Sequence, residues 1–285
     1  LYNIYAGHQL AELEDPAAIP AFIKALFLFP PNNPGMRMND VGQNGLVRIG
    51  RASIPALLEV INGENEEAIA LATAFRDALP PAAQAMVQVG DEVSKEAVTV
   101  LGSLGLEEAW EPVMRETQVE SPFRRTNGAI ALVRLNPRGE RLAEVRDAII
   151  RVYNDTPAEL PLQQRGGIQM QLLAGLRQLY DPSTFDFFRT VMQENNIPDI
   201  KITAINAVGL LANAAEAAAL RTFVTETIGG ATAASALEAN ETILAAATEC
   251  DEDVTCWIGK LTDADENVAR KATFMLARFA RGNDA

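Results

Sequence analysis

The chain has 285 residues and a net charge of −14, and 48% of its residues are apolar while only 6% are aromatic. A nucleic-acid-binding protein needs basic residues to replace the counterions of the phosphates, and an anionic membrane surface also attracts basic segments. The composition therefore excludes nucleic acid as a partner and disfavours an anionic membrane surface. The apolar stretches are shorter than the ~20 residues that span a bilayer, so no transmembrane segment is expected.

The N-terminal end carries few structural signals. The sequence opens at Leu1 without an initiator methionine, which predicts a processed or truncated N-terminus and leaves open a lipid anchor before Leu1. Residues 1–14 are predicted to be an irregular segment. The single histidine of the sequence, His8, lies in this segment and is expected to be a surface residue.

From residue 15 onwards the apolar residues follow a helical period. Ile54, Leu57, Leu58 and Ile61 are spaced by three and four residues, and residues 268–279 repeat this spacing. Such spacing places apolar side chains on one face of an amphipathic helix. No stretch alternates at period two, so the sequence predicts an all-α fold without a sheet.

Helix boundaries are marked by capping residues and prolines. Asp15, Ser121 and Asp181 each precede a proline, which predicts helix starts because proline lacks the N–H that is unpaired in the first turn anyway. The prolines of residues 30–34 predict the one obvious break in the helical pattern.

Internal repeats are the most informative feature of the sequence. Apolar residues lie four, seven, eight and eleven positions after Gly50, and the same offsets recur after Asp15. A single helical hairpin cannot bury both of its apolar faces, so such hairpins stack on one another. We predict a right-handed α-solenoid of about six or seven antiparallel hairpins that forms one domain over residues 15–285. The first helices of the hairpins are predicted to end at Gly50, Gly105, Asn136, Tyr180, Asn213 and Ala280.

Two aromatic groups are candidates for partner binding. Trp110 and Met114 lie on one predicted second helix, and Phe185, Phe187 and Phe188 lie on another. Second helices of solenoids line the concave face, where exposed aromatic residues are natural hot spots for a protein partner. The alternative for both groups is packing in the core.

Cys250 and Cys256 are the two cysteines of the chain, and acidic turn residues separate them. A turn between two helices would bring the sulfur atoms together in a disulfide, which would imply an oxidising compartment. The alternative is a pair of free thiols buried in neighbouring helices. A zinc site is not expected, because it needs more ligands than two cysteines without a nearby histidine.

The sequence offers little for catalysis or cofactor binding. A nucleophilic triad needs a base beside the nucleophile, and His8 is the only imidazole and is distant in sequence from both cysteines. The carboxylates fall mainly on turns and predicted helix starts, where negative charge suits the helix dipole. We therefore expect no catalytic residue, no cofactor and no metal ion.

Several stretches resemble the HEAT-repeat superfamily. They are residues 44–58 (NGLVRIGRASIPALL), 97–105 (AVTVLGSLG), 204–211 (AINAVGLL) and 272–279 (ATFMLARF). The resemblance covers roughly residues 15–281 and implies a helical-repeat fold, while it says little about function.

The C-terminal end carries a narrower resemblance. Cys250, residues 256–261, residues 270–272 and residues 275–278 are similar to the end of bacterial HEAT-repeat proteins that are predicted envelope lipoproteins without an assigned activity. The resemblance implies a location in the periplasm or at the outer membrane.

These features lead to one functional hypothesis and two alternatives. The chain is expected to be a non-catalytic scaffold or accessory subunit that binds a protein partner within a larger envelope assembly. The first alternative is a helical-repeat enzyme of the lyase or isomerase type, which would need a pocket with convergent titratable groups. The second is a chaperone-like protein that holds a client in a continuous apolar groove.

Overall fold

The computed structural model describes residues 2–28, 38–228 and 230–282, and every regular element in these ranges is a helix. The predicted all-α class is therefore confirmed. Within the same ranges, no helix is both long and apolar enough to cross a bilayer. The proline-rich break that the sequence predicts at residues 30–34 lies outside the described residues.

The chain divides into two compact units, residues 1–155 and residues 156–285. Stacked repeats contact mainly their nearest neighbours, so a single continuous array of repeats can also be divided into two compact units. The single domain that the sequence predicts over residues 15–285 therefore stays a prediction, as does the count of six or seven hairpins.

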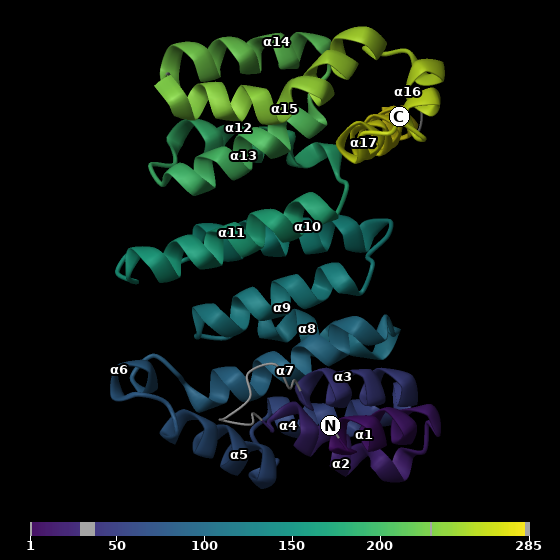
Figure 1. The fold of residues 1–285 in the computed structure, drawn as a ribbon, viewed down its shortest axis with the longest axis vertical. Helices are drawn as coiled ribbons and strands as arrows, with labels where there is room; N and C mark the ends of the chain where they lie inside the picture. The colour runs from purple at the N-terminus through teal and green to yellow at the C-terminus, as the bar shows by residue number, and fades with distance from the viewer. Residues whose placement is uncertain (1, 29–37, 229, 283–285) are drawn as a thin grey trace. The chain divides into compact units, whose positions relative to one another are not determined.

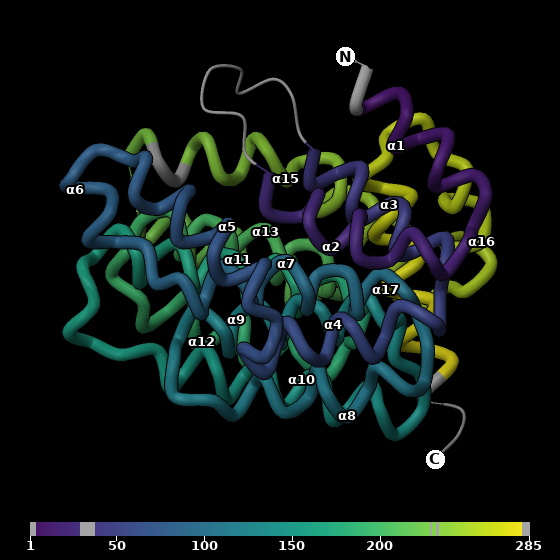
Figure 2. Tube along the Cα trace, turned by 90° about the horizontal axis from the view of Figure 1, so that it is seen from below, coloured from purple at the N-terminus to yellow at the C-terminus, as the bar shows by residue number. Residues whose placement is uncertain are grey.

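The first unit is built from helices that pack on helices one or two places away in the chain. Helix α2 packs on α3, α1 packs on α3, α7 packs on α9 and α8 packs on α9. Figures 1 and 2 show α1 and α3 side by side in both views. The helices are α1 (Tyr2–Glu12), α2 (Ile19–Leu26), α3 (Met38–Ile49), α4 (Ile54–Ile61), α5 (Glu66–Asp77), α6 (Pro81–Gln84), α7 (Val89–Leu104), α8 (Trp110–Glu116), α9 (Pro122–Arg134) and α10 (Glu140–Asn154).

The second unit follows the same plan and ends in a helix that packs across two others. Helix α12 packs on α13, α14 packs on α15, and α17 contacts both α13 and α15. A five-residue π-helical stretch, Val224–Ile228, connects α14 to α15. The helices are α11 (Leu162–Gln178), α12 (Phe185–Glu194), α13 (Pro198–Leu211), α14 (Ala214–Phe223), α15 (Gly230–Cys250), α16 (Val254–Lys260) and α17 (Glu266–Gly282).

The prediction of an irregular segment at residues 1–14 is wrong, because Tyr2–Glu12 forms helix α1. Its own apolar pattern is weak, and the helix is stabilised by packing on α3. Ala11 is buried, and a Cβ placed on Gly7 would come within 2.4 Å of the Val41 side chain on α3. Tertiary packing thus outweighs a poor local helix propensity at this end.

One turn recurs four times and explains the repeat seen in the sequence. A residue in the left-handed region precedes or begins a 3₁₀ turn, and a second helix follows that turn at once. The left-handed residues are Glu14, Gly50, Gly105 and Tyr180. The turns are η1 (Pro16–Ala18), η2 (Gly50–Ser53), η3 (Glu107–Ala109) and η4 (Pro182–Thr184).

Small buried residues hold each of these turns against the core. The last residue of the turn is at most 6% exposed in all four cases, and a larger apolar residue one helical turn later is at most 2% exposed. The small residues are Ala18, Ser53, Ala109 and Thr184, and the larger ones are Phe22, Leu57, Val113 and Phe188. The turn therefore fixes where the first residue of each second helix lies.

The three proline-marked helix starts are confirmed as capped N-termini. The side chain of Asp15 accepts a hydrogen bond from the Ala17 N–H at 2.9 Å, and that of Asp181 accepts one from the Ser183 N–H at 3.0 Å. The hydroxyl of Ser121 accepts the N–H of Arg124 at 3.3 Å. Each cap satisfies a backbone donor that the helix itself leaves unpaired.

Candidate functional site

The second unit contains a pocket of about 460 Å³ bounded by α12, α13, α14 and α17. Its apolar wall comprises Phe185, Met192, Val208, Ala219, Leu220 and Phe223. Polar and charged side chains complete the lining, namely Ser183, Asp186, Arg189, Gln193, Glu216 and Arg278, together with Pro182. A mostly apolar wall with a few placed polar groups is typical of binding sites in proteins.

The charged groups of this pocket are arranged as ion pairs. The Arg278 guanidinium donates to both carboxylate oxygens of Glu216, at 2.8 and 3.0 Å. Arg189 pairs with Asp186 at 2.8 Å and lies 6.0 Å from the centre of the Phe185 ring. The pocket therefore presents balanced charge beside its apolar wall.

Glu216 is held in its ionised form by its neighbours. Burial raises the pKa of Glu216, but hydrogen bonds from Arg278 and from the Asn213 backbone outweigh burial and set the pKa below its ordinary value. The hydrogen bonds that Arg278 donates to Glu216 raise the pKa of Arg278 in return. A carboxylate in this state serves as a fixed charge and an acceptor, and it is poorly suited to exchange protons near neutral pH.

A capping box places Glu216 at the start of α14. The Asn213 side chain accepts the Glu216 N–H at 2.9 Å, and the Glu216 carboxylate accepts the Asn213 N–H at 2.8 Å. This reciprocal pairing satisfies two free donors of the helix terminus, and both carboxylate oxygens still accept hydrogen bonds from Arg278. Sequence reasoning did not select Glu216 or Arg278 as site residues. The Asn-x-x-Glu spacing is the signal that would have placed Glu216 at a helix start.

Lys271 lies two helical turns before Arg278 on α17 and is fully buried. Its ammonium group donates to the carbonyl oxygens of Gly209, Leu210 and Ala212 at 2.7, 3.3 and 2.6 Å. These carbonyls end α13, where no intrahelical donor remains. Burial lowers the pKa of Lys271 to about 7, with Glu216 raising it and Arg278 lowering it further.

The three phenylalanines of α12 lie in different environments. Phe185 is half-buried and lines the pocket. Phe187 is also half-buried but does not line the pocket, and its ring packs edge-on against Phe188. Phe188 is 0% exposed, so it packs in the core, as the alternative interpretation of this group expects.

Trp110 lies at a second, smaller pocket in the first unit. This pocket has a volume of about 300 Å³ and is lined by Trp110, Glu107, Arg141, residues 105–106 and residues 135–138. The Arg141 guanidinium lies 4.4 Å from the centre of the Trp110 ring and pairs with Glu107. Trp110 itself is 5% exposed.

The two pockets lie at equivalent places relative to the recurring turn. Trp110 and Phe185 are each the first residue of a helix that follows a 3₁₀ turn, five residues after a left-handed residue. Met114, the companion of Trp110 in the sequence prediction, is half-buried and does not line the pocket; its sulfur atom lies 3.8 Å from the Thr117 hydroxyl. An aromatic residue at the start of the second helix is thus the recurring feature of both pockets.

Two buried carboxylates of the first unit have structural partners. Glu116 accepts hydrogen bonds from the Ser94 hydroxyl at 2.7 Å and from Arg124 at 2.6 and 2.9 Å. Glu96 accepts a hydrogen bond from Gln43 at 3.0 Å, and burial raises the pKa of Glu96. Neither residue lines one of the two pockets, so both serve to join helices.

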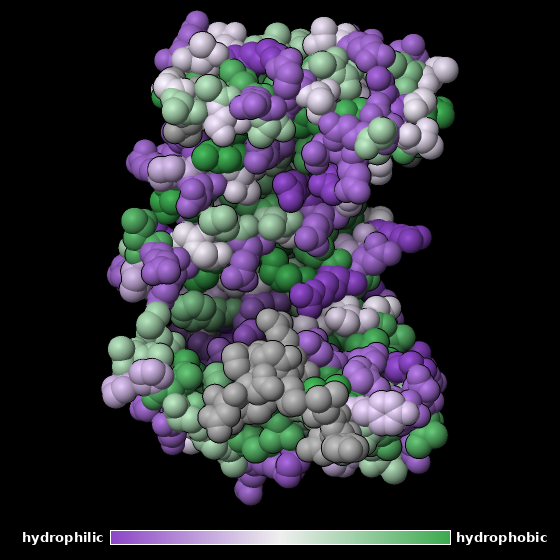
Figure 3. Space-filling view, viewed as in Figure 1, coloured by the Kyte–Doolittle hydropathy of each residue, from purple (hydrophilic) through white to green (hydrophobic). Residues whose placement is uncertain are grey.

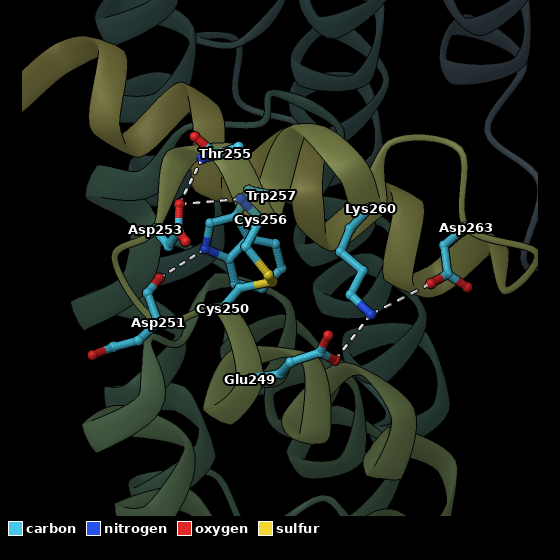
Figure 4. Close-up of a disulfide and its surroundings, with 9 residues drawn as sticks. All are labelled: Glu249, Cys250, Asp251, Asp253, Thr255, Cys256, Trp257, Lys260 and Asp263. Atoms are coloured by element: carbon cyan, nitrogen blue, oxygen red, sulfur yellow. Dashed lines mark hydrogen bonds and ion pairs between the residues drawn. A yellow bond between two sulfur atoms is a disulfide. The ribbon is translucent and has the colours of Figure 1, made fainter.

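Cys250 and Cys256 form a disulfide across the turn between α15 and α16, with their Cα atoms 5.3 Å apart (Figure 4). Trp257 is fully buried beside it and donates its indole N–H to the Asp251 carbonyl at 2.7 Å. Asp253 caps α16 by accepting the N–H groups of Thr255 and Cys256. The two cysteines thus lie at disulfide-bonding distance, as the sequence predicts.

Glu249 is the one further potential metal ligand that lies next to this disulfide in the described residues. Its carboxylate pairs with Lys260 at 2.9 Å, and the two sulfur atoms are bonded to each other (Figure 4). A disulfide sulfur is not the thiolate that binds zinc. This group of residues therefore cross-links α15 and α16 through the disulfide and the Glu249–Lys260 ion pair.

Neither a known protein-family model nor any curated protein matches this sequence.

Proposed function

We propose that this chain is a HEAT-type α-solenoid that binds a protein partner as a scaffold or accessory subunit of a bacterial envelope assembly. The recurring turn supports the repeat interpretation, because four turns with one geometry each start a second helix whose buried residues are equivalent. Such repeats stack so that each buries the apolar face of the next.

The pocket beside Phe185 is the observation that carries the binding function. It offers an apolar wall large enough for one or two side chains of a partner, and its rim carries the ion pairs Glu216–Arg278 and Asp186–Arg189. Hot spots in protein interfaces have this construction, with a desolvated anchor in a pocket and polar groups around it. A partner would insert an apolar side chain against Phe185.

Two observations favour binding over the enzymatic alternative. Glu216, the most buried carboxylate of the pocket lining, is held ionised by Arg278, while an acid–base catalyst needs a pKa near the working pH. His8 lies exposed on α1 and is not part of either pocket lining.

The chaperone-like alternative requires a continuous apolar groove. On the face shown in Figure 3, hydrophobic and hydrophilic residues alternate in small patches over the described residues. This pattern fits a protein that binds its partner through a few apolar contact residues better than one that captures an unfolded client.

The disulfide supports an extracytoplasmic location. Disulfides persist in oxidising compartments such as the bacterial periplasm and are rare in the cytosol. The similarity of the C-terminal residues to envelope HEAT-repeat proteins points in the same direction.

Replacing Phe185 by alanine tests the binding function. The full chain, produced in its native compartment, is purified gently with whatever co-purifies, and partner recovery is measured by quantitative mass spectrometry. We expect Phe185→Ala to reduce the recovery of a stoichiometric partner roughly tenfold, because the anchor loses its apolar contact.

Phe187→Ala provides the matched control, since Phe187 lies on the same helix with similar exposure but outside the pocket lining. Its partner recovery should stay within about twofold of the original chain. Equal recovery with Phe185→Ala and with the original chain would refute the role of this pocket, and a chain that purifies without any partner would contradict the scaffold function.

A further inference from the structure

The smaller pocket, beside Trp110, lies between two chain turns that each contain a left-handed residue. Gly105 follows α7 and has a φ of 63°, and Asn136 follows α9 and has a φ of 54°. Both residues line the pocket of about 300 Å³, together with Trp110 at the start of α8 and Arg141 at the start of α10. Helices α8 and α10 both pack on α9, so the pocket lies where the ends of packed helices meet.

One wall of this pocket is an aromatic ring covered by a paired arginine. The Arg141 guanidinium lies 4.4 Å from the centre of the Trp110 ring and donates to both carboxylate oxygens of Glu107. Glu111 and Glu144 also stabilise the charge of Arg141, although neither of them lines the pocket. The charge of Arg141 is thus already matched by carboxylates of the chain, and its guanidinium covers the ring.

Two polar side chains of the lining have no such partner. Arg138 and Asn136 are exposed, and neither side chain forms a hydrogen bond or an ion pair within the part of the chain that the structure describes. Of the three charged residues in the lining, Arg141 and Glu107 neutralise each other, so Arg138 leaves one net positive charge. The pocket therefore has the opposite sign of charge to the whole chain, whose net charge is −14.

The rest of the lining is mainly apolar. Leu106, Leu135 and Pro137 line the pocket and are half-buried. An apolar group that covered them would remove their remaining surface from water. The volume lies at the lower end of the range for small-ligand sites, which suits one apolar side chain with its own main-chain groups.

We propose that this pocket binds the C-terminal residue of a peptide, with an apolar side chain and a free carboxylate. The Arg138 guanidinium donates to the carboxylate, which supplies the one negative charge that the pocket lacks. The Asn136 amide offers a donor and an acceptor to the last peptide group. Leu106, Leu135 and Pro137 cover the side chain.

The C-terminal residue fits the pocket better than other anions do. It carries its charge on the main chain, directly beside an apolar side chain, whereas an internal acidic residue has its charge at the end of the side chain. A phosphate dianion would bring one charge more than Arg138 matches. The site belongs to the first unit and is separate from the pocket beside Phe185, so it extends the proposed function to a second contact with its own ligand.

Isothermal titration calorimetry of the full chain tests the site with two peptides that differ only in their last group. Acetyl-alanyl-leucine with a free carboxylate should bind, and the same peptide with a C-terminal amide should bind about tenfold more weakly. Arg138→Gln should weaken binding of the acid about tenfold and that of the amide less than about twofold, because only the acid brings a charge to Arg138. Arg134→Gln is the matched control, since Arg134 is exposed four residues earlier but lies outside the lining, and it should leave both affinities within about twofold.

Asn136→Gly tests the contact with the peptide group. Glycine adopts the left-handed conformation of Asn136 readily, so the substitution removes the amide and keeps the turn. Both peptides should bind several-fold more weakly to this variant, in contrast to the selective effect of Arg138→Gln. The thermal midpoints of both variants without peptide should stay close to that of the original chain, because both side chains are exposed. A clear fall in either midpoint would show a structural role and would contradict the proposal.

Tryptophan fluorescence locates the binding. The chain has two tryptophans, and Trp257 is fully buried beside the disulfide of the second unit, so a change in emission on adding the acid reports on Trp110. The proposal is overturned if neither peptide binds at millimolar concentration, if acid and amide bind equally, or if Arg138→Gln binds the acid as tightly as the original chain does. Phe185→Ala should leave the affinity for the acid unchanged, so failure of this site and failure of the pocket beside Phe185 are distinguishable.

Discussion

Replacing Lys271 by methionine is expected to lower the free energy of unfolding by about 3 kcal/mol at pH 7. Methionine has nearly the volume of lysine, so the change removes the three hydrogen bonds without opening a large cavity. The carbonyl oxygens of Gly209, Leu210 and Ala212 would then lie buried at the end of α13 without their donor. Buried acceptors that lose their donor cost more than the bond itself contributed.

The stability that depends on Lys271 should change with pH. The pKa of Lys271 is about 7 in the folded chain and 10.5 in the unfolded chain, so the unfolded chain binds this proton more tightly between these values. Stability therefore rises with pH across that window. From pH 7 to pH 9 the contribution is about 2 kcal/mol, at ~1.4 kcal/mol for each unit that separates the two states.

Urea denaturation of the original chain and of Lys271→Met at pH 7 and pH 9 measures both effects. The difference between them should be about 3 kcal/mol at pH 7 and should widen by about 2 kcal/mol at pH 9. Lys201→Met is the control, because Lys201 lies on α13 with a partly exposed side chain and should change stability by less than ~0.5 kcal/mol. A variant as stable as the original chain at both pH values would contradict this account of the end of α13.

Gly102→Ala is expected to destabilise the first unit by about 2 kcal/mol. Gly102 lies where α7 crosses α9, and a Cβ there would come within 2.7 Å of the Ala131 carbonyl oxygen and 2.9 Å of the Ala131 Cα. These are backbone atoms, so the two helices would have to move apart to accept the methyl group. Thermal or chemical denaturation followed by circular dichroism measures the loss.

Gly90→Ala is a matched control on the same helix. A Cβ on Gly90 would meet no atom within 4 Å, and alanine has the higher helix propensity. The substitution should therefore leave stability unchanged or raise it by up to about 1 kcal/mol. Equal effects of the two substitutions would mean that α7 and α9 do not approach as closely as the structure shows.

The local features of the fold could be predicted from the sequence. Asp15, Ser121 and Asp181 cap helices as their prolines indicate. Gly105 and Tyr180, which the repeat spacing selected as first-helix ends, both adopt left-handed conformations. Short-range chemistry decides these features, because a cap or a left-handed residue depends on its own few neighbours.

The other predicted first-helix ends show that the spacing of apolar residues alone does not locate every helix boundary. Gly50 and Asn136 adopt left-handed conformations just after helices, but Asn213 is the cap of the following helix. Ala280 lies inside α17, which continues to Gly282. The apolar period continues through a helix end when the chain turns without glycine, so period alone does not locate these boundaries.

The candidate site required long-range information. Phe185 was selected because aromatic residues are favoured anchors, yet Arg278 joins it from a helix about ninety residues later in the chain. Likewise, a lysine is ordinarily a surface residue, but Lys271 is buried because the end of α13 packs against it. Burial of a charge depends on which helices pack together, and a single sequence does not state this.

Site-specific photocrosslinking in the native compartment tests the central claim most directly. A photoreactive residue at Gln193, an exposed member of the pocket lining beside Phe185, should crosslink one protein partner in stoichiometric yield. The same residue at Glu238, exposed on α15 outside the pocket, should give little of that product. A partner crosslinked from Gln193 and lost with Phe185→Ala would establish the pocket as a protein-binding site. Crosslinking that is absent at Gln193, or equal at the two positions, would contradict the account.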